Sequence, residues 1–282
     1  MSRSMTTMPT AADPASLVAI DRYPLGDGDC HTWIFDARRG LEHEGVAILP
    51  GFVRPEAVAA MCEEADRLVP LGHHSQVQGT PYLGLPDESF PEGHARRALV
   101  DNSLTAIAYD LIPADSMLRA LYEWPRLTEL VRRMLDRPSL HHYADPFGAL
   151  NIAAMSAGDE LGWHFDQTDF VVSVALQSSS EGGDFESVPR LRSADDDADD
   201  AVSQVLAGDR TLVNSVPMEP GTLMLFEGRN SLHRVTRIEG DVPRYVALLA
   251  YDTVPGTDSS ELLKLVRYGR LPEDDATKGR QQ

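Results

Sequence analysis

Three residues of the sequence have the types and spacing of a metal site. His164 and Asp166 lie two positions apart in the segment WHFDQTDF, and His233 follows later in SLHRV. If the first segment is a strand, side chains two positions apart point to the same face. Two imidazoles and one carboxylate form the ligand set of non-haem Fe(II) centres that keep open coordination positions. We therefore predict that these three residues bind iron.

Arg244 has the side chain needed to hold an organic acid beside such a metal. It lies eleven positions after His233, at the start of the run RYVALLAYD. Three protein ligands leave iron two positions for a bidentate 2-oxo acid and one for O₂. A guanidinium binds a carboxylate through two parallel hydrogen bonds, which suits the distal carboxylate of 2-oxoglutarate. An isolated arginine at a strand start is most simply a surface residue, but neighbouring antiparallel strands would bring this one near the metal.

Several polar residues close to these motifs are candidates for binding the co-substrate or the substrate. Asn151 lies among apolar residues of a predicted strand and needs a hydrogen-bond partner, either 2-oxoglutarate, the substrate or a backbone group. Asp145 precedes that strand and could pair with a substrate amine. Gln167 and Asp169 follow the metal ligands, so either could face the substrate.

Two neighbouring arginines offer a partner for a substrate carboxylate. Arg96 and Arg97 lie in the stretch 70–100, which is rich in Gly, Pro and His and has no clear period. We predict a long loop there, and loops of that length are often functional. The simpler interpretation is that both arginines are surface charges on a mobile loop.

The second half of the chain has the pattern of a β structure that would position these side chains. Short apolar or alternating segments are separated by Gly- and Pro-containing turns. Many short strands with such turns predict a sandwich or a barrel. The predicted strands are 149–155, 170–177, 184–189, 221–228 and 245–252. An acidic and then weakly helical insertion, 190–208, interrupts them; it is either a solvated helix or a lid.

The first half is predicted to be mainly helical. Residues 45–53 form an apolar run bounded by Gly and Pro, which indicates one strand, and three helical stretches follow at 55–69, 104–122 and 124–138. We expect a single domain over 17–269. Its helical part covers about 17–139 and its β core about 140–255, with tails at 1–16 and 270–282.

Composition limits the class of protein. The chain has 282 residues, 42% of them hydrophobic, and a net charge of −19. That charge argues against nucleic acid or an anionic membrane as a partner. No apolar stretch approaches the ~18 residues of a membrane span, and no export signal is recognisable. Cys30 and Cys62 are therefore expected to be free thiols in the cytoplasm. The sequence leaves open whether the protein is a homo-oligomer.

Residues 45–255 resemble the Fe(II)/2-oxoglutarate dioxygenase superfamily, whose fold is a double-stranded β-helix, the cupin-like jelly roll. A closer similarity is carried by LYEWPRLTELV, YADPFGALNIAAM, GDELGWHFDQTDFVVSVALQ and GGDFESVP. These segments resemble the carrier-independent radical halogenases of free amino acids and their hydroxylase relatives. The resemblance implies a mainly β fold with flanking helices (α+β). It also implies that His164, Asp166 and His233 are metal ligands and that Arg244 binds 2-oxoglutarate.

One position of the resemblance separates two reactions. The halogenases carry a small residue in place of the carboxylate ligand, which leaves a position for chloride, whereas this chain has Asp166. The resemblance therefore implies hydroxylation of an unactivated aliphatic C–H bond of a free amino acid, with release of succinate and CO₂. The chain also departs from the pattern: many superfamily members carry Ser or Thr two residues after the arginine, where this chain has Val246.

Two other functions fit the same residues. The same iron chemistry could give desaturation, cyclisation or oxidation of a larger natural-product intermediate. A jelly-roll protein that binds a metal or a small molecule without turnover is the alternative from another class. The full set of three ligands and Arg244 argues against it, because a binding module has no need of open metal positions.

Overall fold

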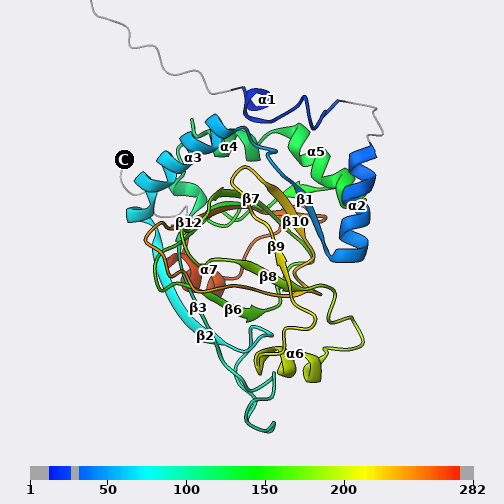
Figure 1. The fold of residues 1–282 in the computed structure, drawn as a ribbon. Coiled ribbons are helices and arrows are strands. Elements are labelled where there is room, and N and C mark those ends of the chain that lie inside the picture. The colour runs from blue at the N-terminus through cyan, green and yellow to red at the C-terminus, as the bar shows by residue number, and fades with distance from the viewer. Residues whose placement is uncertain (1–12, 27–31, 274–282) are drawn as a thin grey trace, which may run out of the picture.

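One antiparallel sheet of eleven strands forms the centre of the computed structural model, which describes residues 13–26 and 32–273 (Figure 1). Ten strands follow the order β1-β10-β7-β12-β5-β3-β6-β11-β8-β9, and β2 pairs with β3. Their bounds are β1 Val46–Leu49, β2 His73–Gly79, β3 Val100–Ile107, β5 Leu150–Met155, β6 Leu161–His164, β7 Val171–Gln177, β8 Phe185–Val188, β9 Asn214–Val216, β10 Leu223–Phe226, β11 Leu232–Val235 and β12 Arg244–Leu249. β4 His141–His142 and β13 Tyr251–Asp252 form a separate pair.

Helices from the first half of the chain cover one face of the sheet, and α7 lies on its other side (Figure 1). The helices are α1 Pro14–Leu17, α2 Thr32–Glu44, α3 Pro55–Leu68, α4 Met117–Tyr122, α5 Pro125–Met134, α6 Asp199–Leu206 and α7 Glu261–Tyr268; short 3₁₀ turns are η1 Val69–Leu71 and η2 Tyr109–Leu111. Every helix in the described part of the chain is too short or too polar to cross a bilayer.

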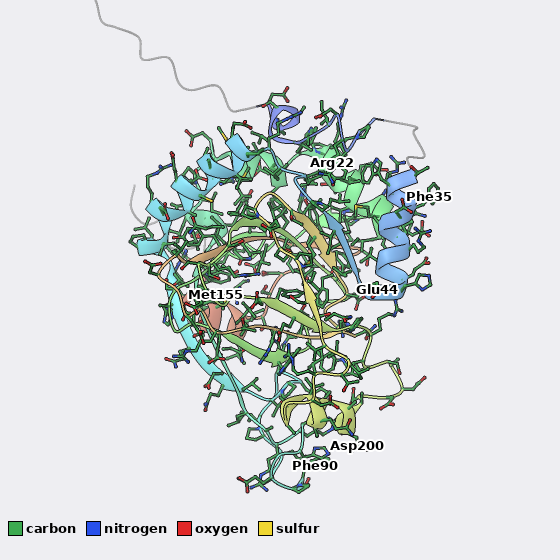
Figure 2. The ribbon with its side chains drawn as sticks, viewed as in Figure 1. Arg22, Phe35, Glu44, Phe90, Met155 and Asp200 are labelled. Carbon is green, nitrogen blue, oxygen red and sulfur yellow. The ribbon has the colours of Figure 1, made fainter. Side chains whose placement is uncertain are left out.

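The sheet is rolled around a second core. Side chains on its outer face, such as Ile152 and Ala247, pack with the helices in the main hydrophobic cluster. Residues that alternate with them point inward, where Ala153 and Met155 of β5 belong to a separate cluster with Phe185 of β8 and Val235 of β11; Met155 is labelled in Figure 2. Strands buried on both faces need apolar residues at nearly every position, which explains runs such as LNIAAM and VVSVALQ. The expected mainly β fold with flanking helices is confirmed.

Two predictions in the first half are wrong. The stretch 70–100 is not only a loop, because β2 occupies its start and pairs with β3 over seven residues. The start of the predicted helix 104–122 is instead the end of β3, and the chain becomes helical at η2 and α4. β2 is mostly exposed and polar, so it has no apolar alternation to reveal it. β3 is fixed by pairing with β2 and β5, which overrides its local preference.

The ends of the domain also differ from expectation. α1 begins within the predicted tail 1–16: Asp13 caps it, and Leu17 is buried in the main core. The sequence did not predict α2 or α7. The predicted helices 55–69 and 124–138 are confirmed as α3 and α5, and the insertion 190–208 contains α6. Cys62 is a free thiol, as expected, whereas Cys30 lies outside the described residues.

Candidate metal centre

Neighbouring strands place the two candidate histidine ligands directly opposite each other. His164 ends β6 and pairs in register with His233 on β11. Side chains opposite each other in an antiparallel pair share a face of the sheet. Their ring centroids are 4.2 Å apart. Residues separated by almost seventy positions in the chain therefore meet through one strand pair.

Asp166 lies two residues past the end of β6 and turns its carboxylate toward both rings. Its Oδ1 is 3.9 Å from His164 Nε2, and its Oδ2 is 3.5 Å from His233 Nε2. One ligand atom from each of the three residues lies within 4.8 Å of the others. Two nitrogens and one oxygen converging from one side match the donor set of Fe(II) sites with open positions, so these residues fit an iron ion.

Backbone carbonyls fix the orientation of both imidazoles. His164 Nδ1 lies 2.7 Å from the carbonyl oxygen of Gly162, and His233 Nδ1 lies 2.9 Å from that of Ser231. A neutral imidazole that donates Nδ1–H to a carbonyl leaves Nε2 free as a ligand, which is the usual arrangement behind metal-binding histidines. Burial and the neighbouring His233 lower the pKa of His164 to about 4, so this ring is neutral near pH 7.

Gly228 makes the space that the Asp166 carboxylate occupies. A Cβ atom at residue 228 would lie only 1.7 Å from Asp166 Oδ2. The backbone N–H of Asp166 donates to the carbonyl of Gly228 at 3.0 Å. Arg229 holds the following residues, because it donates to the carbonyl oxygen of Gln167 and pairs with Asp169. The sequence alone does not reveal this role of Gly228, because it depends on a contact between two loops.

Arg244 reaches the inside of the sheet by a different route from the one expected. β12 pairs with β5 and β7 and is not a neighbour of β11, so strand adjacency does not bring Arg244 toward His233. The rolling of the sheet does so instead. The Arg244 Cδ atom lies 3.2 Å from the position of a Cβ on Gly183, two residues before β8, and β8 pairs with β11.

The Arg244 guanidinium is buried without a carboxylate partner among the described residues. The residue is 7% exposed, and burial lowers its pKa to about 10, with Asp184 the only nearby charge opposing the shift. A buried cation needs an anion to offset its desolvation. The site therefore fits the distal carboxylate of 2-oxoglutarate.

Two further polar atoms on the inner face lack partners in the described chain. Asn151 on β5 and Ser173 on β7 flank Leu248 of β12 in register, so all three side chains share one face with Arg244. Asn151 Oδ1 and Ser173 Oγ are buried and accept or donate no hydrogen bond. Such atoms are rare unless a ligand or water meets them. Ser173 was missed, although a lone serine in an apolar strand was a usable signal.

Asp145 is the predicted substrate residue with free hydrogen-bonding capacity. It is 1% exposed, and its Oδ1 accepts from the backbone N–H of Phe147 at 2.8 Å. Its Oδ2 is buried and has no partner in the described residues. A Cβ on Gly148 would lie 2.5 Å from that oxygen, so the glycine keeps the carboxylate accessible from within the fold.

The other predicted substrate residues are engaged elsewhere. Arg96 pairs with Asp197 and Asp199 of the insertion. Arg97 donates to the carbonyl oxygen of Phe90. Asp169 pairs with Arg229. Each of these three side chains is therefore already held by other residues of the described chain.

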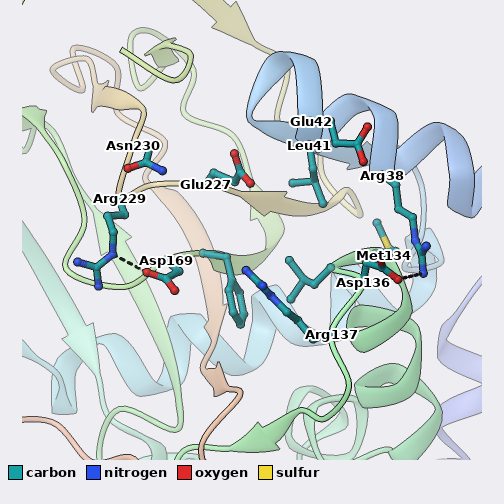
Figure 3. Close-up of a pocket in the computed structure, with 12 residues that line it drawn as sticks. Arg38, Leu41, Glu42, Met134, Asp136, Arg137, Asp169, Glu227, Arg229 and Asn230 are labelled. Carbon is teal, nitrogen blue, oxygen red and sulfur yellow. Dashed lines mark hydrogen bonds and ion pairs between the residues drawn. The ribbon is translucent and has the colours of Figure 1, made fainter. Parts of the chain in front are cut away.

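A pocket of about 330 Å³ lies behind the loop that carries Asp166 (Figure 3). Its walls come from the ends of α2 and α5 and from the segments around Asp169 and Arg229, whose ion pair crosses one side. None of the three candidate metal ligands lines it. The pocket is therefore a neighbour of the metal centre rather than part of it.

The sequence matches one protein-family model. The model described as Halogenase D matches residues 30–261. A comparison with curated proteins finds no match.

Several solved structures share this fold. AviO1 from Streptomyces viridochromogenes Tue57 has a TM-score of 0.54 and 19% identity, over 80% of this chain and 97% of its own. The carbocyclase SnoK from nogalamycin biosynthesis has a TM-score of 0.54 and 16% identity, over 85% and 93%. HygX from Streptomyces hygroscopicus, solved with nickel, 2-oxoglutarate and hygromycin B, has a TM-score of 0.51 and 16% identity, over 83% and 95%. These likenesses confirm the expected jelly-roll fold.

Proposed function

The chain belongs to the family described as Halogenase D, and from this premise we propose that it is an Fe(II)- and 2-oxoglutarate-dependent oxygenase that hydroxylates an aliphatic carbon of a free amino acid. The resemblance to iron and 2-oxoglutarate oxygenases expected from the sequence is confirmed by the family match and the shared fold. The reaction and the substrate are the proposal.

His164, Asp166 and His233 would hold the iron. Bound Fe(II), with 2-oxoglutarate and O₂, supplies an oxidant strong enough to take hydrogen from an aliphatic C–H bond. The chain's own contribution is to hold three ligands on one side and leave the other side open. The carbonyls of Gly162 and Ser231 keep the Nε2 atoms directed at the metal position.

Arg244 would bind the distal carboxylate of 2-oxoglutarate, and Asn151 and Ser173 would offer further hydrogen bonds on the same inner face. The support is that all three are buried, that Asn151 Oδ1 and Ser173 Oγ have no hydrogen-bond partner, and that Arg244 has no carboxylate partner among the described residues. Ser173 and Asn151 are candidates for the second anchor that Val246 cannot provide. Binding the acid would also exclude water from the Arg244 site, which strengthens the ion pair.

Asp166 is the observation that favours hydroxylation over halogenation. Its carboxylate faces both histidines, and Gly228 leaves room for that carboxylate at a distance no other residue type would permit. A halide would need the position that this oxygen takes. The family description names a halogenase, so this chain is proposed to be a member in which the carboxylate replaces the halide.

A free amino acid as substrate is supported by Asp145. A buried carboxylate with one unpaired oxygen suits an ammonium group, which would satisfy its charge and its hydrogen-bonding capacity. Gln167 and Asp169, directly after the ligand loop, stay candidates for contacts at the mouth of the site. Arg96 and Arg97 are less suited, because each already has partners.

Oxidation of a larger molecule is the second candidate. Similar structures include a carbocyclase and an epimerase from nogalamycin biosynthesis and a complex with hygromycin B, so this fold serves such reactions elsewhere. A cyclised or desaturated product is lighter than its substrate by two hydrogens, whereas a hydroxylated product is heavier by one oxygen. Product mass therefore separates the two candidates.

The test is an assay with Fe(II), 2-oxoglutarate and O₂ against a panel of free L-amino acids, in buffers with and without chloride. We expect succinate formation that one or a few amino acids stimulate, together with a product heavier by one oxygen in both buffers. Slow succinate release that no amino acid stimulates would support the iron chemistry and would indicate that the substrate is a larger molecule. No release of succinate under any condition would contradict the oxygenase proposal itself.

A further inference from the structure

The C-terminal helix α7 is oriented with its apolar side outward. Its sequence is ELLKLVRY, and the two residues that it buries, Lys264 and Tyr268, are one turn apart. Leu262 and Val266 lie on the opposite side, because residues two positions apart on a helix point in nearly opposite directions. Leu262 is 72% exposed, and the other exposed apolar residues of the helix are Leu263, Leu265 and Val266. A surface helix normally has the reverse arrangement, so this apolar face is left uncovered by the described chain.

The buried side of α7 explains why the helix keeps this orientation. Lys264 is buried, and its ammonium group pairs with Asp258 at 2.6 Å. Tyr268 enters the inner core, where its ring meets that of Phe147 with centroids 5.6 Å apart. Turning the leucines inward would break the ion pair of a buried lysine and remove Tyr268 from the core, and both changes are costly. The fold therefore fixes the leucines on the outside.

The strand β2, which lies beside this helix, is a free edge of the sheet. Among the described strands it pairs only with β3, in continuous register over seven residues. Its other edge therefore presents N–H and C=O groups that no described strand meets. Edge strands are usually protected from further pairing by charged residues, proline or a bulge. The sequence of β2, HHSQVQG, has no Lys, Asp, Glu or Pro, and its register has no bulge.

The helix and the strand edge form one continuous surface. α7 contacts β2, and the two elements lie close together in Figure 1. At the end of the helix, a Cβ on Gly269 would lie 2.5 Å from Nδ1 of His73, the first residue of β2. His73 and Val77 are four positions apart and share a face of the strand. Val77 is 40% exposed, so an apolar residue of the strand lies on the same face as the helix.

A second copy of this chain fits this surface better than other partners do. The net charge of −19 disfavours an anionic membrane or a nucleic acid. A free strand edge is self-complementary: two copies of β2 related by a two-fold axis pair antiparallel, and each face of one sheet continues into the same face of the other. A stable dimer buries at least about 1,000 Å². A helix of eight residues is too short to supply that area alone, and the seven-residue edge extends it.

We propose that the chain forms a homodimer in which the free edges of two β2 strands pair antiparallel across a two-fold axis. The two copies of α7 then lie on the same side of the joined sheet, beside the edge at which the copies meet, and the second copy covers their leucines. The main-chain groups of the edge gain hydrogen-bond partners, and the exposed apolar residues leave water. The interface is separate from the candidate metal ligands, so it does not depend on the proposed reaction.

The test is the mass of the full chain in solution, measured by analytical ultracentrifugation over a dilution series. We expect a particle of twice the mass of the chain. Val77→Lys places two like charges close together across the two-fold axis, and the double variant Leu262→Glu with Val266→Glu makes the outer face of α7 charged. Each should raise the dissociation constant of the dimer by at least about 30-fold, the scale of a central interface residue.

The substituted side chains are exposed, so each variant should keep its fold as a monomer. Circular dichroism and thermal unfolding at low concentration check this. Phe35→Glu is the matched control, because Phe35 is also a large exposed apolar residue but lies on α2, on the side of the molecule away from β2 (Figures 1 and 2). This control should dimerise as tightly as the wild type.

Amide hydrogen exchange in residues 73–79 locates the interface independently. Successive N–H groups of a strand point to opposite edges, so pairing with β3 alone protects only alternate amides of β2. In the dimer the remaining amides should be protected as well, and they should lose that protection on dilution and in Val77→Lys.

Three results would overturn the proposal. The first is a wild-type protein that is monomeric throughout the dilution series. The second is a dimer that keeps its wild-type affinity in Val77→Lys or in the double variant of α7. The third is protection of every β2 amide that does not change with dilution, which would mean that other residues of the same chain cover the edge.

Discussion

Asp166 is the residue that most directly distinguishes hydroxylation from halogenation. A carboxylate there lies with His164 and His233 in a group that could hold a metal ion, and it would take one coordination position of that ion. Gly228 is its complement, since any side chain at 228 would occupy the volume of the Asp166 oxygens. The carboxylate of Asp166 and the absence of a side chain at Gly228 together favour transfer of oxygen, rather than of a halide, to the substrate.

We expect Asp166→Ala to lose both metal affinity and hydroxylation. The variant removes one of three ligands, and even changes in groups behind a ligand cost about 10- to 100-fold in metal affinity. Metal content after dialysis and product formation are the measurements. Asp101→Asn, an exposed position whose carboxylate accepts from Gln78, is the matched control and should behave as the wild type. Full turnover and metal content in Asp166→Ala would refute the ligand assignment.

Arg244→Ala should raise the requirement for 2-oxoglutarate while leaving metal binding intact. Removing the buried partner of a carboxylate costs about 2–5 kcal/mol, which corresponds to a rise of roughly 30-fold or more in the apparent dissociation constant. Succinate formation as a function of 2-oxoglutarate concentration measures it. Arg237→Ala removes an exposed arginine paired with Glu160 and should change nothing. An unaltered 2-oxoglutarate dependence in Arg244→Ala would mean that another residue holds the acid.

At the scale of elements, ion pairs and hydrogen bonds hold the insertion around α6 against residues 82–96, the segment that follows β2. Arg96 pairs with Asp197 and Asp199, the Tyr82 hydroxyl donates to Asp199 at 2.6 Å, and the backbone N–H of Ala95 donates to Ser203 at 2.9 Å. Phe90 and Asp200 mark the same end of the molecule in Figure 2. The two segments therefore form one unit over this end of the sheet.

This unit also contacts the segment after β6, which lies between two of the candidate metal ligands. Phe165, between His164 and Asp166, stacks on Tyr82 with ring centroids 5.6 Å apart, and the Arg192 guanidinium lies 4.1 Å from the centre of the Phe165 ring. Aromatic and cation–π contacts of this kind each contribute about 0.5–1.5 kcal/mol. Loosening the insertion should therefore also affect the residues beside the candidate metal site.

Asp199→Asn should loosen the insertion without unfolding the domain. The variant weakens charged hydrogen bonds from Arg96 and Tyr82, each worth about 1.5–3 kcal/mol. Amide hydrogen exchange should become faster by about 5- to 100-fold in residues 80–98 and 199–206 and stay unchanged in β7 and β12. Asp200→Asn changes the neighbouring, solvated carboxylate and should leave the exchange rates as they are. Equal protection in Asp199→Asn and the wild type would show that these contacts do not hold the insertion.

The sequence predicted the strands whose burial pattern is visible locally and missed those defined by their partners. β5, β7 and β10 are continuous apolar runs bounded by turns, and they were predicted correctly. β2 is polar and exposed, and β3 has mixed character; both exist because they pair with each other. The candidate ligands His164 and Asp166 were visible from their types and spacing, although β6 ends at His164 and Asp166 lies in the loop that follows. Gly228 was not visible, since its role depends on a contact with a distant segment.

At the scale of the molecule, the rolled sheet brings together parts of the chain that strand adjacency alone would keep apart. β12 and β11 are separated in the sheet by β5, β3 and β6, yet Arg244 and His233 both face the enclosed core. Phe226 links the layers, because its ring meets both Phe185 and His233, with centroids 5.1 and 4.8 Å away. The interior of the roll is thus the place where the metal, the 2-oxo acid and the substrate can meet.

Binding of metal and 2-oxoglutarate should stabilise the whole domain. A ligand that binds only the folded state at 100 times its dissociation constant adds about 2.7 kcal/mol to the free energy of unfolding. For a domain of this size that corresponds to a rise of roughly 5–10 °C in Tm. Thermal unfolding with Ni²⁺ and 2-oxoglutarate, singly and together, measures it, with Asp166→Ala as the control that should not respond to the metal. Equal Tm values with and without the ligands would contradict the proposed site.

The most direct measurement is the mass of the product formed from the amino acid that stimulates succinate release, in a buffer that contains both O₂ and chloride. We predict a product heavier than its substrate by one oxygen atom, labelled when the reaction runs under ¹⁸O₂, and no chlorinated product. A chlorinated product from the wild-type protein would contradict the argument from Asp166.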